Sequence, residues 1–136
     1  MRQYVGVVLV KSDASVLVQH RDDNPEILGS NTWCVVGGKR EEGESLEKAA
    51  ARELKEETGY IVDDENLNFL IQDEYVTEKG VSVQRIIFWN KYDEKQEIKC
   101  YEGQEIKFVF PEELEILNLY TGHKDFLKKA SEKMRR

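Results

Sequence analysis

Three glutamates spaced along one helical segment could hold a metal ion: Glu53, Glu56 and Glu57. At about 100° per residue, Glu53 and Glu57 fall on the apolar face of that segment, and Glu56 lies at its edge. The apolar residues of this face are Leu46, Ala49 and Ala50. Carboxylates that face a protein interior repel one another and lose their hydration. An ordinary acidic surface helix would instead place them toward water, so the pattern predicts a bound divalent cation.

The segment from Gly38 to Tyr60 resembles the Nudix box, G-x(5)-E-x(7)-R-E-U-x-E-E-x-G-U, in which U is apolar. The matching residues are Gly38, Glu44, Arg52, Glu53, Leu54, Glu56, Glu57 and Gly59. Tyr60 stands at the last apolar position, where an aliphatic residue is usual. A match of this length is rare by chance even in a glutamate-rich chain. The resemblance implies a hydrolase that uses a metal to cut the pyrophosphate bond of a nucleoside diphosphate linked to another moiety.

The resemblance to Nudix hydrolases also implies roles for the acidic residues and the cofactor. It makes Glu56 and Glu57 metal ligands, and it leaves Glu53 as a ligand, the general base or both. The backbone carbonyl of Gly37 or Gly38 is expected to add a further ligand. The expected ion is Mg²⁺, which favours hard oxygen ligands and bridges phosphates, with Mn²⁺ as a substitute. The expected catalytic group is Glu53, Glu56 and Arg52.

Other box residues are expected to support this array. Arg52 lies one turn before Glu56 and can orient a carboxylate through a forked hydrogen bond. Glu44 is expected to connect the preceding loop to the helix start. Gly38 and Gly59 are predicted to adopt backbone conformations that are costly for other residues.

Five residues outside the box helix are candidates for substrate binding, each with a plain structural alternative. Arg21 follows a predicted strand, where related enzymes place a phosphate-binding cation, and Lys39 could also meet phosphate unless it is simply solvated. One of Glu102 and Glu105 is expected to supply an extra carboxylate, without a choice between them. Tyr75 lies near the position of a tyrosine in diadenosine-polyphosphate hydrolases, although tyrosines are common in strands.

Composition indicates an ordinary globular domain. The 136 residues are 40% hydrophobic and 35% charged, and such a chain can bury a sizeable core. No apolar run approaches the ~20 residues of a membrane span, and no signal peptide is recognisable, so we expect a cytoplasmic protein with no membrane partner. Cys34 and Cys100 lack metal-binding spacing and are expected to be buried or half-buried free thiols. The net charge of −7 argues against binding of long nucleic acids, which requires a basic face, but not against a small polyphosphate.

The order of apolar and turn patterns predicts the fold. Strands are predicted at residues 4–11, 15–21, 33–36, 67–77, 81–92 and 105–110, with a polar loop at 22–31. Helices are predicted at 46–58, with Ser45 as N-cap and Gly59 as C-terminal stop, in a short stretch from Pro111, and at 123–133. This order favours an α+β class with an α/β/α sandwich and a central mixed sheet. In the Nudix fold the box forms a loop–helix–loop, and residues 1–136 are expected to form one Nudix domain.

Three functions remain open at this point. The leading one is Mg²⁺-dependent hydrolysis of a nucleoside triphosphate, a dinucleoside polyphosphate or a nucleotide sugar. The alternative is a catalytically silent Nudix-like module that senses a nucleotide, although such modules usually lose box carboxylates and this chain has all of them. A third is an acidic helix that holds Ca²⁺ only for stability. Family resemblance also favours a homodimer.

Overall fold

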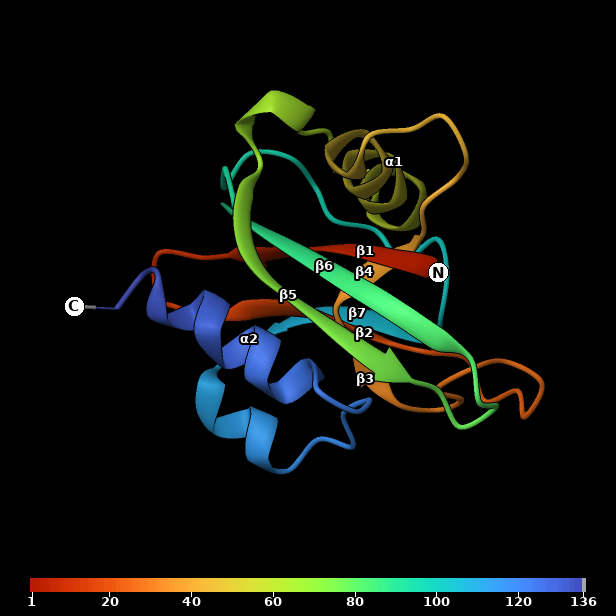
Figure 1. Cartoon of the computed structure of the whole chain (residues 1–136). Helices are drawn as coiled ribbons and strands as arrows, with labels where there is room; N and C mark the ends of the chain where they lie inside the picture. The colour runs from red at the N-terminus through yellow and green to blue at the C-terminus, as the bar shows by residue number, and fades with distance from the viewer. Residues whose placement is uncertain (136) are drawn as a thin grey trace.

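The computed structural model describes residues 1–135 and shows a mixed sheet between two helices (Figure 1). Helix α1 (Leu46–Thr58) covers one face of the sheet and α2 (His123–Glu132) covers the other. The strands are β1 (Arg2–Val10), β2 (Val16–His20), β3 (Trp33–Cys34), β4 (Val36–Lys39), β5 (Asn68–Val76), β6 (Ser82–Lys91) and β7 (Glu105–Val109). Their order is β3-β2-β1-β6-β5, with β4 beside β1 and β7 beside β2. Among the paired strands of residues 1–135, β1 and β6 alone run parallel and the other pairs are antiparallel. The expected α+β class and mixed sheet are therefore confirmed.

Strand β1 joins the two halves of the hydrophobic core. Successive side chains of a strand point to opposite faces, so Val5 and Val7 pack toward α1 while Val8 and Val10 pack toward α2. All four side chains are fully buried. A strand covered on both faces has a continuous apolar sequence, which explains the unbroken run at the start of the chain.

The chain between residues 33 and 39 differs from the prediction of one strand that ends before the double glycine. It forms two short strands because the chain changes partner near Val35: β3 pairs with β2, and β4 pairs with β1. Gly37 therefore lies inside β4, opposite Gly6 of β1. A Cβ atom at Gly37 would lie 2.1 Å from the carbonyl oxygen of Val5, so only glycine allows this close pairing.

The ends of α1 agree with the sequence prediction. The Ser45 hydroxyl accepts a hydrogen bond from the Lys48 amide at 3.1 Å, which satisfies one of the free N–H groups at the helix start. Gly59 adopts φ 79° and donates its N–H to the carbonyl oxygen of Lys55 at 2.9 Å, as expected for a left-handed C-terminal stop. Tyr60 is buried, so the aromatic residue at the last box position packs into the core.

Several smaller features complete the comparison with the sequence. A short 3-10 helix at Asp64–Asn66 has no counterpart in the prediction, whereas Pro111–Glu115 forms the expected short helix. Cys34 is buried as expected, but Cys100 is exposed because it lies on the loop that leads to β7. Within residues 1–135, no helix has both the length and the apolar character needed to cross a bilayer.

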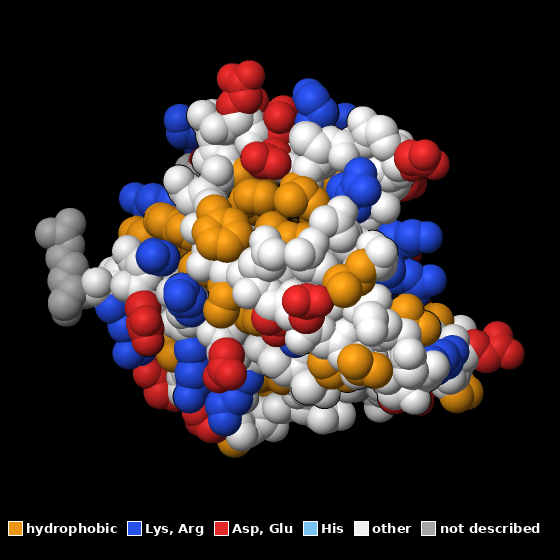
Figure 2. All heavy atoms as spheres, viewed as in Figure 1, with side chains coloured by type: hydrophobic (Ala, Val, Ile, Leu, Met, Phe, Trp, Pro, Cys, Tyr) orange, Lys and Arg blue, Asp and Glu red, His pale blue; other side chains and the backbone are white. Residues whose placement is uncertain are grey.

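Strand β5 forms one edge of the sheet and carries exposed apolar side chains, among them Phe69 and Val76. Figure 2 shows apolar side chains gathered across the face that carries β5 and β6, with charged groups around them. An uncovered edge strand can pair with another chain. The expected homodimer stays a prediction.

His123 is a buried histidine that should make the fold sensitive to acid. Its Nδ1 accepts a hydrogen bond from the Val35 amide at 2.9 Å, and burial lowers its pKa to about 3. The unfolded chain binds this proton near pH 6.5, so the contribution of neutral His123 is present above pH 6.5. It is lost at about 1.4 kcal/mol per pH unit as the pH falls toward 3.

We therefore expect the free energy of unfolding to rise more steeply between pH 4.5 and 6.5 in the wild type than in His123→Asn. Urea unfolding at a series of pH values measures this difference, and all other titrating groups contribute equally to both proteins. Equal slopes in the wild type and His123→Asn would contradict the assignment.

Candidate active site

Glu57 is a buried carboxylate with one oxygen left unsatisfied. The residue is only 4% exposed. One carboxylate oxygen, Oε1, accepts a long hydrogen bond from Gln19 Nε2 at 3.4 Å, and the other, Oε2, has no partner within the described residues. Burial, followed by the nearby charges of Glu53 and Glu102, raises the pKa of Glu57 to about 9. A buried polar atom without a partner lowers the stability of the fold, so a bound cation or a proton would stabilise this oxygen.

Glu53 lies beside Glu57 on the same side of α1 and against the backbone of β4. A Cβ atom at Gly38 would come within 2.4 Å of the Glu53 carboxyl group, so the carboxylate occupies the space that a side chain would fill. Burial raises the pKa of Glu53, opposed by the hydrogen bond from Arg52. Gly38 is not among the glycines with a positive φ. The prediction of a special backbone conformation is therefore wrong for Gly38 and correct for Gly59, because Gly38 provides room rather than a turn.

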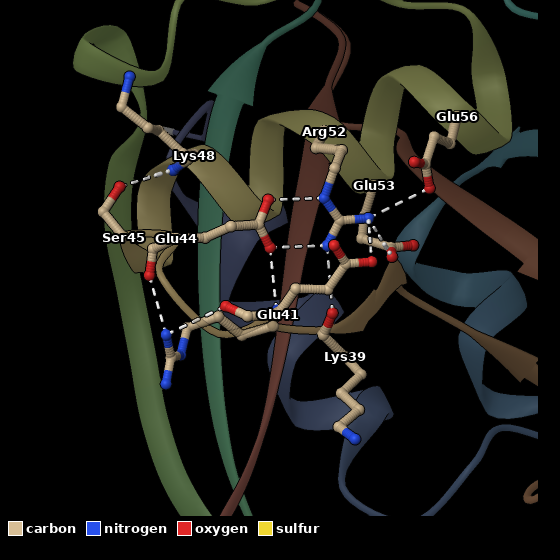
Figure 3. A network of polar contacts seen from close by, with 9 residues as sticks. Lys39, Glu41, Glu44, Ser45, Lys48, Arg52, Glu53 and Glu56 are labelled. Carbon is tan, nitrogen blue, oxygen red and sulfur yellow. Dashed lines mark hydrogen bonds and ion pairs between the residues drawn. The ribbon is translucent and has the colours of Figure 1, made fainter.

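Arg52 connects the loop before α1 to the carboxylates on the helix (Figure 3). Its guanidinium binds Glu44 through two hydrogen bonds, from Nε at 2.7 Å and from Nη2 at 2.9 Å. Its Nη1 reaches Oε1 of Glu53 at 2.9 Å and Oε2 of the more exposed Glu56 at 3.2 Å. The Arg52 hydrogen bonds hold the pKa of Glu44 at about 2. The bracing contacts expected of Arg52 and Glu44 are thus present.

Glu102, and not Glu105, is the loop carboxylate that the structure brings to the box. The charge of Glu102 raises the pKa of both Glu53 and Glu57. Glu105 instead faces Lys107 at 3.9 Å on the surface of β7. The choice left open by the sequence depends on a chain reversal near Gly103, which has φ 84°, and such a reversal cannot be placed from spacing alone.

Gln19 is a site residue that the sequence analysis missed. Its Nε2 donates to the backbone oxygen of Glu102 at 3.1 Å and to Glu57, so it connects β2 to the loop and to the helix. The residue is buried. The available signal was a polar residue directly after the apolar run at residues 16–18, within the predicted strand.

The carboxylate oxygens of Glu53, Glu56 and Glu57 are ligands that suit a hard divalent cation. No group of three or more His, Cys, Asp or Glu side chains in residues 1–135 already has the arrangement of a metal site. Figure 3 shows that Arg52 engages both Glu53 and Glu56. The unsatisfied oxygen of Glu57 and the mutual repulsion of the carboxylates nevertheless favour a cation, and oxygen ligands suit Mg²⁺.

A cavity of about 250 Å³ opens beside the box at Gly37 and Gly38. Its lining also includes Tyr4, Arg21, Lys39, Tyr75, Arg85 and Tyr120. Arg21 Nε donates to the Leu28 carbonyl at 2.8 Å, and its guanidinium forms no ion pair with any residue in the described range. Tyr75 and Tyr120 meet edge to face, with ring centroids 5.8 Å apart. Three of the candidate substrate-binding residues, Arg21, Lys39 and Tyr75, therefore line one cavity.

Arg85, which the sequence analysis did not single out, stiffens one wall of this cavity. It is buried and binds Asp73 through two hydrogen bonds, at 2.8 and 2.7 Å. Its guanidinium also lies 4.4 Å from the centre of the Tyr75 ring, a cation–π distance. The Arg85 guanidinium makes its hydrogen bonds within the protein. Arg85 therefore positions the Tyr75 ring and is not available as a cation for a phosphate.

Comparison with known proteins identifies the family of this chain. The family model described as NUDIX domain matches residues 1–130. An RNA pyrophosphohydrolase of Rhodospirillum rubrum is 28% identical over 134 residues, which cover 92% of this chain and 68% of that protein. The chain therefore belongs to the Nudix family, in the class of Nudix pyrophosphohydrolases.

Solved structures show the same fold at low sequence identity. The MutT protein of Methanosarcina mazei Go1 has a TM-score of 0.81 and 22% identity, covering 99% of this chain and 96% of that chain. A C. elegans Ap4A hydrolase has a TM-score of 0.78 and 21% identity, covering 98% of each chain. At these identities the likeness supports the architecture, and the substrate must be argued from the site.

Proposed function

We propose that this protein hydrolyses the pyrophosphate bond of a nucleotide with the help of Mg²⁺. The main support for this proposal is the buried Oε2 atom of Glu57, which lies beside Glu53 and has no hydrogen-bond partner within residues 1–135. A helix that served only to stabilise the fold would gain nothing from a buried carboxyl group next to a second carboxylate and a substrate-sized cavity. All box carboxylates are present, which favours an enzyme over a silent nucleotide sensor.

The residues that would hold the ion are Glu53, Glu56 and Glu57, with a backbone carbonyl from Gly37 or Gly38 and with Glu102 nearby. A bound Mg²⁺ neutralises phosphate oxygens and makes water easier to deprotonate. Arg52 keeps the carboxylates oriented through its hydrogen bonds. Glu53 has the environment of a general base, because its raised pKa brings its proton affinity closer to neutral pH.

The cavity beside β4 is proposed to bind the nucleoside and the adjoining phosphate. Tyr75 and Tyr120 offer aromatic surface against which a base can pack. Arg21 offers a guanidinium without a carboxylate partner, which suits a phosphate oxygen. The similarity to an RNA pyrophosphohydrolase and to the fold of an Ap4A hydrolase supports a substrate that contains a nucleotide polyphosphate.

A substrate screen with Mg²⁺ and product identification by mass tests the proposal. We expect a nucleoside monophosphate plus the remaining phosphorylated fragment from at least one nucleotide substrate. Glu56→Gln should remove this activity without unfolding the protein, because the side chain is 56% exposed. Lys55→Gln, the neighbouring exposed position on α1, is the matched control and should retain it. Full activity in Glu56→Gln, or no turnover of any nucleotide by folded protein, would overturn the proposal.

A further inference from the structure

We propose that His123 selects the nucleobase of the substrate, because its Nε2–H group donates a hydrogen bond to a carbonyl oxygen of the base. The preferred substrates are then nucleotides with an oxo base, such as hypoxanthine, guanine or uracil, rather than an amino base such as adenine or cytosine. This inference rests on the proposed function, since it places the nucleoside in the cavity beside β4. It adds a specificity-determining residue and narrows the class of nucleotide.

The first residue of α2 is held in the wall of the cavity by the turn before it. Gly122 adopts φ 85°, and an added Cβ atom would lie 2.5 Å from Nη2 of Arg85. Arg85 also donates from Nη1 to the carbonyl oxygen of Thr121 at 2.6 Å. The turn therefore packs directly on a buried guanidinium. His123 is the next residue, and it is only 2% exposed and lines the cavity.

The neutral ring of His123 carries its proton on the nitrogen that the fold does not use. Nδ1 accepts a hydrogen bond from the Val35 amide at 2.9 Å, so it holds no proton. Burial, followed by the charges of Arg85 and Arg21, lowers the pKa of the ring to about 3, and a neutral imidazole has one N–H group. That group is therefore Nε2–H, and near neutral pH this atom can act only as a donor.

The Nε2 atom is reached from the cavity and has no hydrogen-bond partner in residues 1–135. In that range, Oε2 of Glu57 is the one fully buried side-chain oxygen or nitrogen of a buried or half-buried residue that lacks a hydrogen bond. Nε2 of His123 also lacks one, so it must keep some accessible surface, and the cavity is the hollow that this residue lines. A donor that is almost buried and unpaired lowers stability. An oxygen atom of a ligand would satisfy it.

The surroundings of Nε2 favour a carbonyl oxygen over an amino group. The rings of Tyr120 and His123 meet edge to face, with centroids 5.6 Å apart, so a base that packs on Tyr120 lies next to this donor. Among the described residues, no Asp, Glu or Asn side chain lines the cavity, and the amide oxygen of Gln3 already accepts from Arg40 at 2.6 Å. An amino group on the base would face a donor and find no carboxylate, whereas a carbonyl oxygen would accept from Nε2.

Titration with inosine monophosphate and adenosine monophosphate tests the inference, since one purine carries a carbonyl oxygen where the other carries an amino group. Neither nucleotide has a pyrophosphate bond, so binding is measured without turnover. We expect the Kd of the wild type to be at least about tenfold lower for inosine monophosphate, because the competing amino group leaves the donor unpaired. Nitrogen NMR of the imidazole should show the proton on Nε2, and this signal should shift when inosine monophosphate is added.

Two substitutions of His123 separate the donor from the fold. In His123→Asn the amide oxygen can replace Nδ1 as the acceptor for Val35, but the donor at the place of Nε2 is lost. The preference should then fall to within about twofold of equal affinity. In His123→Gln the amide nitrogen can take the place of Nε2, so the preference for inosine monophosphate should return in part.

Several results would overturn the role of His123 as the residue that selects the base. These are equal affinity for the two nucleotides in the wild type, tighter binding of adenosine monophosphate, or binding of neither. An equal loss of affinity for both nucleotides in His123→Asn would also overturn it, because the donor would then meet the ribose or the phosphate. Failure of the proposed function would look different, since no nucleotide in the substrate screen would be cleaved whether or not inosine monophosphate binds.

Discussion

Replacing Glu57 by glutamine is expected to abolish hydrolysis and, in the metal-free protein, to increase stability. Glu57 holds a carboxylate oxygen in the interior without a partner, and burial raises its pKa to about 9. Glutamine has nearly the same shape and is neutral without a bound proton. The substitution therefore removes the ligand that a metal needs and, in the metal-free protein near neutral pH, the free-energy cost of protonating this carboxyl group on folding.

Both effects should be large enough to measure. Loss of a metal ligand removes several kcal/mol of transition-state stabilisation, which corresponds to a fall in kcat of at least about a thousandfold. Relief of a buried, unpaired carboxylate should increase the free energy of unfolding by about 1–2 kcal/mol. Opposite changes in activity and stability are typical of functional sites, where a group is kept in an unfavourable environment.

Activity assays and urea unfolding in the presence of a chelator measure the two effects, and Mg²⁺ titration of stability links them. Added Mg²⁺ should raise the free energy of unfolding of the wild type and should have little effect on Glu57→Gln. Glu56→Gln is the matched control, because it changes the same chemical group at an exposed position and should lose activity without gaining stability. A Glu57→Gln protein that is less stable than the wild type without metal would show that Oε2 is satisfied in solution.

Local patterns in the sequence predicted the box helix α1 well. The boundaries of α1 depend on the Ser45 cap and the Gly59 stop, and these act within one turn. The position of Glu53 and Glu57 on the inner face follows from helical periodicity with Ala50 and Leu54, which the structure buries. These features are short-range, so composition and spacing are sufficient to predict them.

The features that the sequence did not reveal depend on contacts between distant segments. Gln19 reaches Glu57 across 38 positions and Glu102 across 83 positions, and no local pattern encodes such a meeting. Arg85 contacts Asp73 on the neighbouring strand, a pairing that requires the β5–β6 register. The cavity at Gly37 and Lys39 likewise depends on the pairing of β4 with β1, which joins segments that are distant in the sequence.

Gly37 and the adjacent Gly38, which opens the box, should respond differently to alanine, because each must be small for a different reason. At Gly38 an added Cβ would meet the Glu53 carboxyl at 2.4 Å, and the end of a side chain can move away. We expect Gly38→Ala to fold with a stability within about 0.5 kcal/mol of the wild type. Its kcat should fall by about a hundredfold, since a displacement of about 1 Å in a reacting group has an effect of this size.

Gly37→Ala is the matched variant with the opposite expectation. Its Cβ would lie 2.1 Å from the Val5 carbonyl oxygen and 2.7 Å from the Gly6 Cα, and these backbone atoms belong to the β1–β4 ladder. Separating the strands should lower the free energy of unfolding by about 2 kcal/mol or more. Urea unfolding and kcat measured on both variants distinguish the two roles. Wild-type kcat in a folded Gly38→Ala protein would mean that hydrolysis does not depend on the place of the Glu53 carboxylate against β4.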